Sequence, residues 1–389
     1  MTPILAWGLA QGANALNIIA GVIVAHLASP GDFARFATLS AALAIIAAAI
    51  NPLINEIAQR VASHRSVEFG ALKSRSCIAL SAAIVINICA CASIVDSGID
   101  AVIIYALMPV AFVAQSWVIA TLYGLHRMVA AGSILCAAGL GRIATLCGFI
   151  AVGATFTGAT TSYLVYFLVT VIGAPWLLSG YLSKNEEADW STNWRLICGF
   201  FLLALPFSLD QPIVQALFTD ISADYAALMT YARSLMLLAT PALTIIYSAS
   251  IQTDATEIPA ETKLPRFTKP FGLAVIFAFG LAAILWVIHP FLFPLLLGAK
   301  YLHTTSHLGL ALCAIALHVI SYFLIQRLLL ACSWRLCGVL AIPPVTQAIF
   351  LTLQSSPSVH DLTVIALSVL FLQTLLALWA TQRSFAKKR

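Results

Sequence analysis

The chain has 389 residues, of which 61% are hydrophobic and 9% carry a charge, and its mean hydropathy is +0.98. A water-soluble domain of this size would lack the polar side chains needed to cover its surface, so a soluble protein is excluded. The net charge of +5 follows from basic residues placed in loops and does not indicate a nucleic-acid partner.

Apolar stretches of about 20 residues, the length that crosses a bilayer as a helix, repeat along the whole chain. Hydropathy predicts about twelve such spans, and the short alternating strands of an outer-membrane barrel are not seen in the sequence. We therefore expect an all-α polytopic membrane protein. The predicted spans centre near Ala15, Ala47, Val85, Val113, Thr145, Val171, Ala204, Ala242, Phe279, Ala316, Val345 and Val369.

A polar segment near the middle of the chain divides the predicted spans into six and six. We expect an N-terminal six-helix lobe over residues 1–183, a cytoplasmic linker over residues 184–195 and a C-terminal six-helix lobe over residues 196–389. Because each half holds an even number of spans, the two halves would be parallel, pseudo-symmetric repeats. A weak match between Gly31–Leu43 and Ala223–Leu235 at equivalent positions favours a duplication.

Basic residues are distributed unequally between the two sides of the membrane. If the N-terminus is cytoplasmic, sixteen of the twenty Lys and Arg residues fall on the cytoplasmic side, and Arg35, Arg233 and Lys300 fall on the other. Cytoplasmic loops normally carry the excess of Lys and Arg, so we expect both termini in the cytoplasm.

The first span carries three amides, Gln11, Asn14 and Asn17, at intervals of three residues. This spacing places them on one helix face, where they would line a cavity or hydrogen-bond to a neighbouring helix.

The second span holds Asn51, Asn55 and Glu56 near its cytoplasmic end. We take these three residues, together with Arg233, as candidates for ion coupling or gating. The alternative for Glu56 is a position among the lipid headgroups, paired with Arg60 one helical turn away.

Arg142 is the deepest cation in the predicted spans, near the centre of the fifth. Placing an arginine there costs about 2.5–3.5 kcal/mol on insertion scales, so it needs a carboxylate, a wet cavity or an anionic ligand. Its planar guanidinium can donate two hydrogen bonds to one phosphate. A structural ion pair, for example with Asp210, is the alternative.

In the seventh span Asp210 and Gln211 lie between two prolines, and Gln215 follows one turn later. Asp210 lies ~12 Å from the outer end of the span, too deep for its carboxylate to reach water easily. We expect it to face a cavity, where it would bind a coupling cation or order Arg142. A buried ion pair is the alternative.

Motifs for ATP hydrolysis and for metal binding are not found: the sequence contains neither GxxxxGK[ST] nor HExxH. We therefore expect a non-enzymatic protein without a metal or cofactor, driven by ion gradients, the membrane potential or mass action.

Four segments together resemble the O-antigen and exopolysaccharide flippases of the multidrug/oligosaccharidyl-lipid/polysaccharide (MOP) superfamily. Their order and spacing carry the resemblance more than any one of them does. They are Leu9–Phe33, Leu122–Arg127 followed by Arg142, Leu205–Asp210 with Ala223–Ala226, and Phe293–Tyr301.

This resemblance implies a two-lobed bundle of twelve helices around a central cavity in the bacterial cytoplasmic membrane. It implies alternating access that moves an undecaprenyl-diphosphate-linked oligosaccharide to the outer leaflet for cell-surface polysaccharide biosynthesis. The expected partners are this lipid-linked oligosaccharide, membrane lipid, a coupling cation (H+ or Na+) and polysaccharide assembly proteins.

Three other functions fit the sequence less well. A cation-coupled multidrug exporter of the same superfamily would share the architecture but would favour a cavity without a central arginine. A membrane-embedded glycosyltransferase or polymerase would usually carry a long outer loop, and the outer loops here are short. A flippase of the peptidoglycan precursor would usually be longer by two helices.

Overall fold

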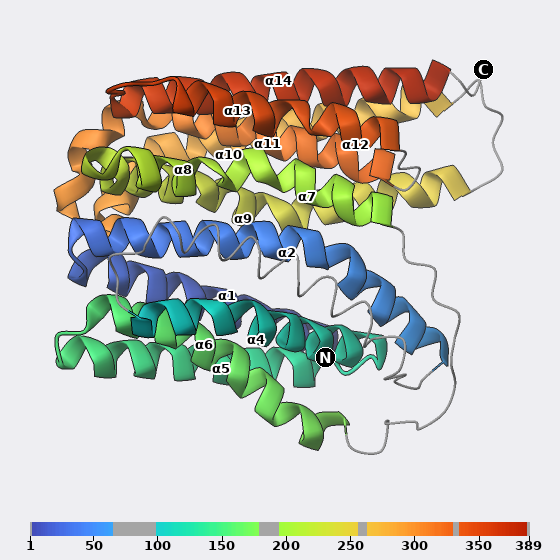
Figure 1. Ribbon diagram of the computed structural model, residues 1–389. Helices are drawn as coiled ribbons and strands as arrows, with labels where there is room; N and C mark the ends of the chain where they lie inside the picture. The colour runs from blue at the N-terminus through green and yellow to red at the C-terminus, as the bar shows by residue number, and fades with distance from the viewer. Residues whose placement is uncertain (1, 65–98, 179–193, 256–262, 330–333, 387–389) are drawn as a thin grey trace. The chain divides into compact units, whose positions relative to one another are not determined.

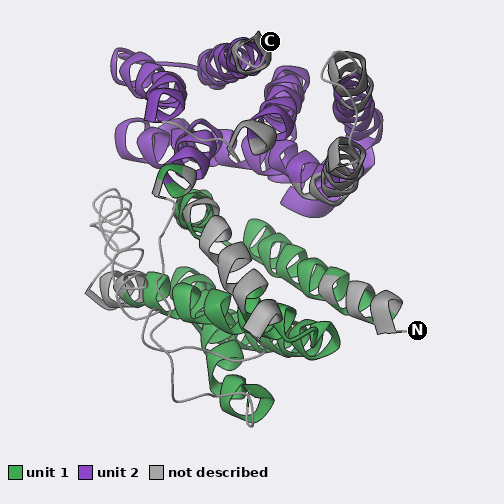
Figure 2. Cartoon of the chain, turned by 90° about the vertical axis from the view of Figure 1, so that its right-hand side faces the viewer, with its two compact units in different colours: residues 1–197 green, residues 198–389 purple. Residues whose placement is uncertain are grey.

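The computed structural model describes residues 2–64, 99–178, 194–255, 263–329 and 334–386 (Figure 1). Within these ranges every regular element is a helix, so the expected all-α class is confirmed for the described part of the chain. The chain divides into two compact units, unit 1 (residues 1–197) and unit 2 (residues 198–389), which Figure 2 colours separately. Most of the expected linker lies outside the described residues, so the exact lobe boundaries stay a prediction.

Unit 1 contains five described helices, and α6 lies next to both α4 and α5. Helix α5 packs against both α1 and α6, and α4 packs against α2 and α6. Their bounds are α1 (Thr2–Leu27), α2 (Pro30–His64), α4 (Ile99–Gly124), α5 (Met128–Ala151) and α6 (Thr155–Leu178).

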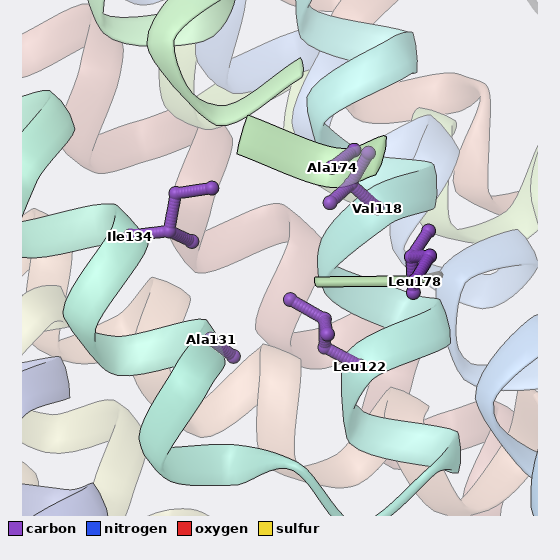
Figure 3. Packing of buried hydrophobic residues seen from close by; sticks show 6 residues of the cluster. All are labelled: Val118, Leu122, Ala131, Ile134, Ala174 and Leu178. Atoms are coloured by element: carbon purple, nitrogen blue, oxygen red, sulfur yellow. The ribbon is translucent and has the colours of Figure 1, made fainter. Parts of the chain in front are cut away.

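Buried aliphatic side chains from three of these helices meet in one cluster (Figure 3). In lipid there is little hydrophobic drive between helices, so tight packing of such side chains is what holds them together. The cluster consists of Val118 and Leu122 on α4, Ala131 and Ile134 on α5, and Ala174 and Leu178 on α6.

Helices α1 and α5 approach closely at small residues. A Cβ atom added at Gly139 would lie 2.9 Å from the Cβ of Leu16, and one added at Gly12 would lie 3.4 Å from the Sγ of Cys136. The Cys136 thiol also donates a hydrogen bond to the Leu9 carbonyl at 3.0 Å. Small residues at such crossings let two membrane helices touch along their backbones.

Unit 2 contains eight helices and one 3-10 segment in its described residues. Helix α11 contacts α9, α10 and α14, and the short α8 contacts α9 and α13. The bounds are α7 (Trp194–Ser208), α8 (Asp210–Leu217), α9 (Thr219–Ala255), α10 (Lys263–Leu297), η3 (Ala299–His307), α11 (Leu308–Leu329), α12 (Trp334–Leu340), α13 (Ile342–Thr352) and α14 (Val359–Ala386).

Seven helical segments among the described residues are long and apolar enough to cross a membrane, and α7 with α8, bent by 46°, would make an eighth. The chain is therefore a multi-pass membrane protein. Each expected span centre that falls among the described residues lies within a helix, whereas Val85 lies outside them. A total of about twelve spans remains a prediction.

The close approach of α1 and α5 can be tested with alanine substitutions on one helix. Gly139→Ala should lower the free energy of unfolding of the purified protein by about 1–3 kcal/mol, the usual cost of overpacking, because the added Cβ meets Leu16. Gly148→Ala on the same helix is the control, because a Cβ there meets nothing within 4 Å. Equal stability of the two variants by thermal unfolding would contradict this packing.

Candidate functional site

Arg142 lies on α5 with 3% of its surface exposed. Its Nη1 donates a hydrogen bond to Oδ1 of Asn17 on α1 at 2.8 Å. The guanidinium carbon lies 3.7 Å from the ring centre of Tyr163 on α6, a close cation–π contact. Helices α1, α5 and α6 therefore meet around this one charge.

No carboxylate of the described residues forms an ion pair with Arg142. Its Nε is buried and has no hydrogen-bond partner there. A buried charge normally requires a paired counter-ion, because desolvation costs several kcal/mol per ion. An amide and an aromatic ring offset only part of that cost, so the charge of Arg142 is only partly compensated by the described contacts.

The ring beneath Arg142 is fixed by its own contacts. The hydroxyls of Tyr163 and Ser40 lie 3.0 Å apart, and Ser40 donates its proton to the Phe36 carbonyl. Ser40 has one proton to give, so Tyr163 must be the donor between the two hydroxyls. The Tyr163 ring also stacks with Phe36 and with Phe167, with ring centres 5.6 and 6.2 Å away. Contacts with three neighbouring side chains therefore hold the ring that carries the guanidinium.

The three amides of the first span lie in different surroundings. Asn17 is half-buried and contacts Arg142, Gln11 is half-buried, and Asn14 is exposed. A cavity-lining role for the three together stays a prediction. Asn51, Asn55 and Glu56 belong to α2, and their side chains lie outside the described part of the chain.

In unit 2 the seventh expected span is broken between Ser208 and Asp210, where α7 ends and α8 begins. Pro212 explains the break, because it has no N–H to donate to the Ser208 carbonyl and its ring would clash with that carbonyl. In the first turn of α8 the same proline is tolerated, since amides there have no intrahelical partner. The break leaves carbonyl groups at the end of α7 in need of donors.

Arg233 on α9 joins the two sides of this break. Its Nε donates to the Phe207 carbonyl of α7 at 3.0 Å, and its Nη2 contacts Oδ1 of Asp210, the first residue of α8, at 2.5 Å. The side chain of Arg233 is 15% exposed and pairs with a buried carboxylate. Its expected place on the outer side of the membrane stays a prediction.

Asp210 is 1% exposed, and both of its carboxylate oxygens are occupied. Besides the contact with Arg233, Oδ1 accepts the Gln211 backbone N–H at 2.8 Å, and Oδ2 accepts the Tyr225 hydroxyl at 2.5 Å. The described contacts thus make Asp210 one half of a closed buried ion pair. Gln211 and Gln215 are buried on the same helix, at 0% and 5% exposure.

Sequence reasoning missed the neutral residues that organise both charges. Tyr163 and Tyr225 resemble ordinary core aromatics in an apolar span, and only their contacts reveal a role. His318 is buried on α11, stacks on Phe207 at 4.6 Å and lies 3.2 Å, Nδ1 to Oε1, from Gln373. The sequence offers one signal for these residues, which is a polar atom in the middle of a span.

Comparison with known proteins supports the fold through structure alone. No protein-family model matches the sequence. The search of curated proteins gives no significant match.

Three solved structures align with nearly the whole chain. An inward-facing multidrug resistance MATE family transporter of the MOP superfamily gives a TM-score of 0.64 at 13% identity, covering 99% of each chain. A MOP superfamily transporter from Pyrococcus furiosus gives 0.55 at 12% identity, covering 99% of this chain and 94% of that one. An outward-facing MATE family transporter gives 0.53 at 14% identity with the same coverage. The chain therefore has the fold of the MATE transporters of the MOP superfamily.

The Asp210–Arg233 pair can be tested with a double-mutant cycle. Removing one partner of a buried ion pair costs about 3–5 kcal/mol, so Asp210→Asn and Arg233→Gln should each lower thermal stability and folded yield. The double variant should lose clearly less than the sum of the two losses, because it leaves no unpaired charge. Additive losses in the unfolding temperature would show that the two side chains are not coupled.

Proposed function

We propose that the chain is a flippase that moves an undecaprenyl-diphosphate-linked oligosaccharide across the bacterial cytoplasmic membrane by alternating access. The fold supports membrane transport as the class of function. The observation that supports an anionic substrate is that the buried guanidinium of Arg142 has no carboxylate partner among the described residues. The product would serve cell-surface polysaccharide biosynthesis, with polysaccharide assembly proteins as further partners.

The chemistry of a diphosphate matches what Arg142 offers. Arginine binds phosphate through parallel N–H groups of its planar fork, and such charge-assisted bonds are about twice as strong as neutral ones. The Nε of Arg142 has no partner, while Nη1 is held by Asn17. A diphosphate would supply both the missing counter-charge and the missing acceptors, and its lipid tail would stay in the bilayer.

A cation-coupled multidrug exporter is the second candidate, because two of the structural neighbours are multidrug resistance transporters. A cationic drug would be bound by an available carboxylate. Asp210 is the one buried carboxylate of the described residues, and Arg233 and Tyr225 already occupy it. The neighbour from Pyrococcus furiosus is described as having a binding pocket of reverse polarity that suggests a different function. Pocket polarity thus varies within this fold, so the fold by itself does not require a cationic substrate here.

Coupling to H+ is assigned to the Asp210–Arg233 pair, and Asn51, Asn55 and Glu56 are the further candidates for coupling to H+ or Na+. Protonation of Asp210 would remove its charge and weaken its hold on Arg233, which also contacts the Phe207 carbonyl of α7. Because Arg233 joins α7 to α8, weakening this contact would loosen the helix break. An ion gradient could in this way act on the conformation of unit 2.

Arg142 variants test the substrate class. Arg142→Ala should remove most flipping of lipid-linked oligosaccharide while the protein still inserts, since losing an intramembrane charge eases insertion. Arg142→Lys should keep partial activity, because it retains the charge but loses the fork. The measurement is flipping in cells or vesicles, normalised to the amount of folded protein.

Arg35→Ala is the matched control, because Arg35 is a partly exposed arginine of the same unit, 4.0 Å from the carboxylate of Asp32. Partly exposed ion pairs of this kind contribute little to stability, so Arg35→Ala should flip the lipid-linked oligosaccharide at the wild-type rate. Full activity in Arg142→Ala would contradict the proposed function.

The unequal distribution of basic residues generates a topological prediction. A reporter that is active only in the cytoplasm should be active when fused after Arg389, and a reporter that is active only outside should be silent there. The opposite pattern would reverse the assigned direction of transport.

A further inference from the structure

Three buried glutamines of unit 2 have amide atoms without hydrogen-bond partners. Gln211 and Gln347 are 0% exposed and Gln215 is 5% exposed. Both side-chain polar atoms of Gln211 lack a partner, and so do the Oε1 atoms of Gln215 and Gln347. Buried polar groups in proteins are nearly always satisfied, and leaving one unsatisfied costs about 1–3 kcal/mol. Several in one region therefore point to an occupant.

The three side chains belong to one region around the break between α7 and α8. Gln211 and Gln215 are four residues apart on α8, so they share a face of that helix. Helix α13 packs against α8, and Gln347 on α13 donates from Nε2 to the Pro206 carbonyl at 3.1 Å. That carbonyl lies in the last turn before the break, which brings the Gln347 amide to the start of α8. Discontinuous membrane helices of this kind typically form the substrate sites of transporters.

The unpaired atoms specify the chemistry of the occupant. A cation would satisfy the amide oxygens but leave the Nε2 of Gln211 without an acceptor. An anion would satisfy that nitrogen and leave the oxygens without donors. A neutral molecule with several hydroxyls satisfies all of them, because each hydroxyl donates one hydrogen bond to an amide oxygen and can also accept one from the nitrogen. Since both ends of the Gln211 amide are unpaired, the conclusion does not depend on which end is the nitrogen.

The charges beside the glutamines also favour a neutral occupant. Asp210 directly precedes Gln211, but its charge is balanced by Arg233 at 2.5 Å. The Tyr225 hydroxyl donates to the same carboxylate and is not available to a ligand. The region therefore offers amides without a net charge.

We propose that Gln211, Gln215 and Gln347 form a binding site for an uncharged, hydroxyl-bearing group. That this group is the sugar part of the substrate rests on the function proposed above. That it bears hydroxyls rests only on the unpaired amide atoms.

Thermal unfolding of the purified full chain tests this site. The probes are glucose, galactose, N-acetylglucosamine and maltose, each added at a series of concentrations. At least one should raise the unfolding temperature of the wild type by about 2 °C or more beyond the rise seen in Gln211→Met. Methionine fills a similar volume without polar atoms. Without sugar, Gln211→Met should be at least as stable as the wild type, because it removes an unpaired buried amide.

Gln373→Met is the matched control, because both ends of the Gln373 amide are bonded within unit 2, to the Leu203 carbonyl and to His318. It should be less stable than the wild type yet keep the full response to sugar. Gln215→Met serves as a second site variant if Gln211→Met does not fold, and it should also lose the response.

Three results would overturn the site. Equal stabilisation of the wild type and Gln211→Met by every sugar would be the general effect of excluded osmolytes. A more stable Gln211→Met with no sugar response in the wild type would mean that ordered water fills the region. Stabilisation of the wild type by NaCl over choline chloride, lost in Gln211→Met, would identify a cation site.

Farnesyl diphosphate, which carries no sugar, separates this inference from the proposed function. Arg142→Ala should lose the stabilisation by farnesyl diphosphate and keep the response to sugar, and Gln211→Met should show the reverse. A wild type that responds to sugar but not to farnesyl diphosphate would contradict the anionic substrate and leave the glutamine site supported.

Discussion

A guanidinium buried in a membrane helix is costly, and Arg142 and Arg233, two arginines of the described residues, meet that cost in different ways. Arg233 is neutralised inside the protein by Asp210, and the same side chain also serves the Phe207 carbonyl. Arg142 contacts an amide and an aromatic ring and keeps its Nε without a partner. One arginine is therefore paired with a carboxylate, whereas the other has no carboxylate partner among the described residues. The proposed function follows from this difference.

The need to pair every buried polar group also explains the helix break in unit 2. Pro212 interrupts the seventh expected span, and in lipid the freed carbonyl groups must find donors within the protein. Long side chains from neighbouring helices supply them: Arg233 reaches Phe207, and Gln347 reaches Pro206. The donors hold the break in place while the amide oxygens beside it remain unpaired. The break therefore places polar side chains within the span while the Phe207 and Pro206 carbonyls are hydrogen-bonded.

Hydropathy predicted the helices well, because membrane length and backbone satisfaction leave few alternatives for apolar stretches. Depth within a span also identified Arg142 and Asp210 as residues that require partners. The partners themselves were not predictable. Asp210 pairs with Arg233 on another helix, and Tyr163 looks like a core aromatic until its ring is seen beneath a guanidinium. Such contacts depend on helix rotation and on the bend between α7 and α8, which residue patterns in one sequence do not specify.

The most direct measurement compares two cargoes in vesicles that contain the purified protein. One cargo is a short-chain prenyl-diphosphate oligosaccharide, and the other is a fluorescent lipophilic cation of the kind that drug exporters carry. Because Arg142 has no carboxylate partner among the described residues while Asp210 is already paired with Arg233, we expect movement of the diphosphate cargo and no transport of the cation above empty vesicles. Transport of the cation with no movement of the diphosphate cargo would contradict it.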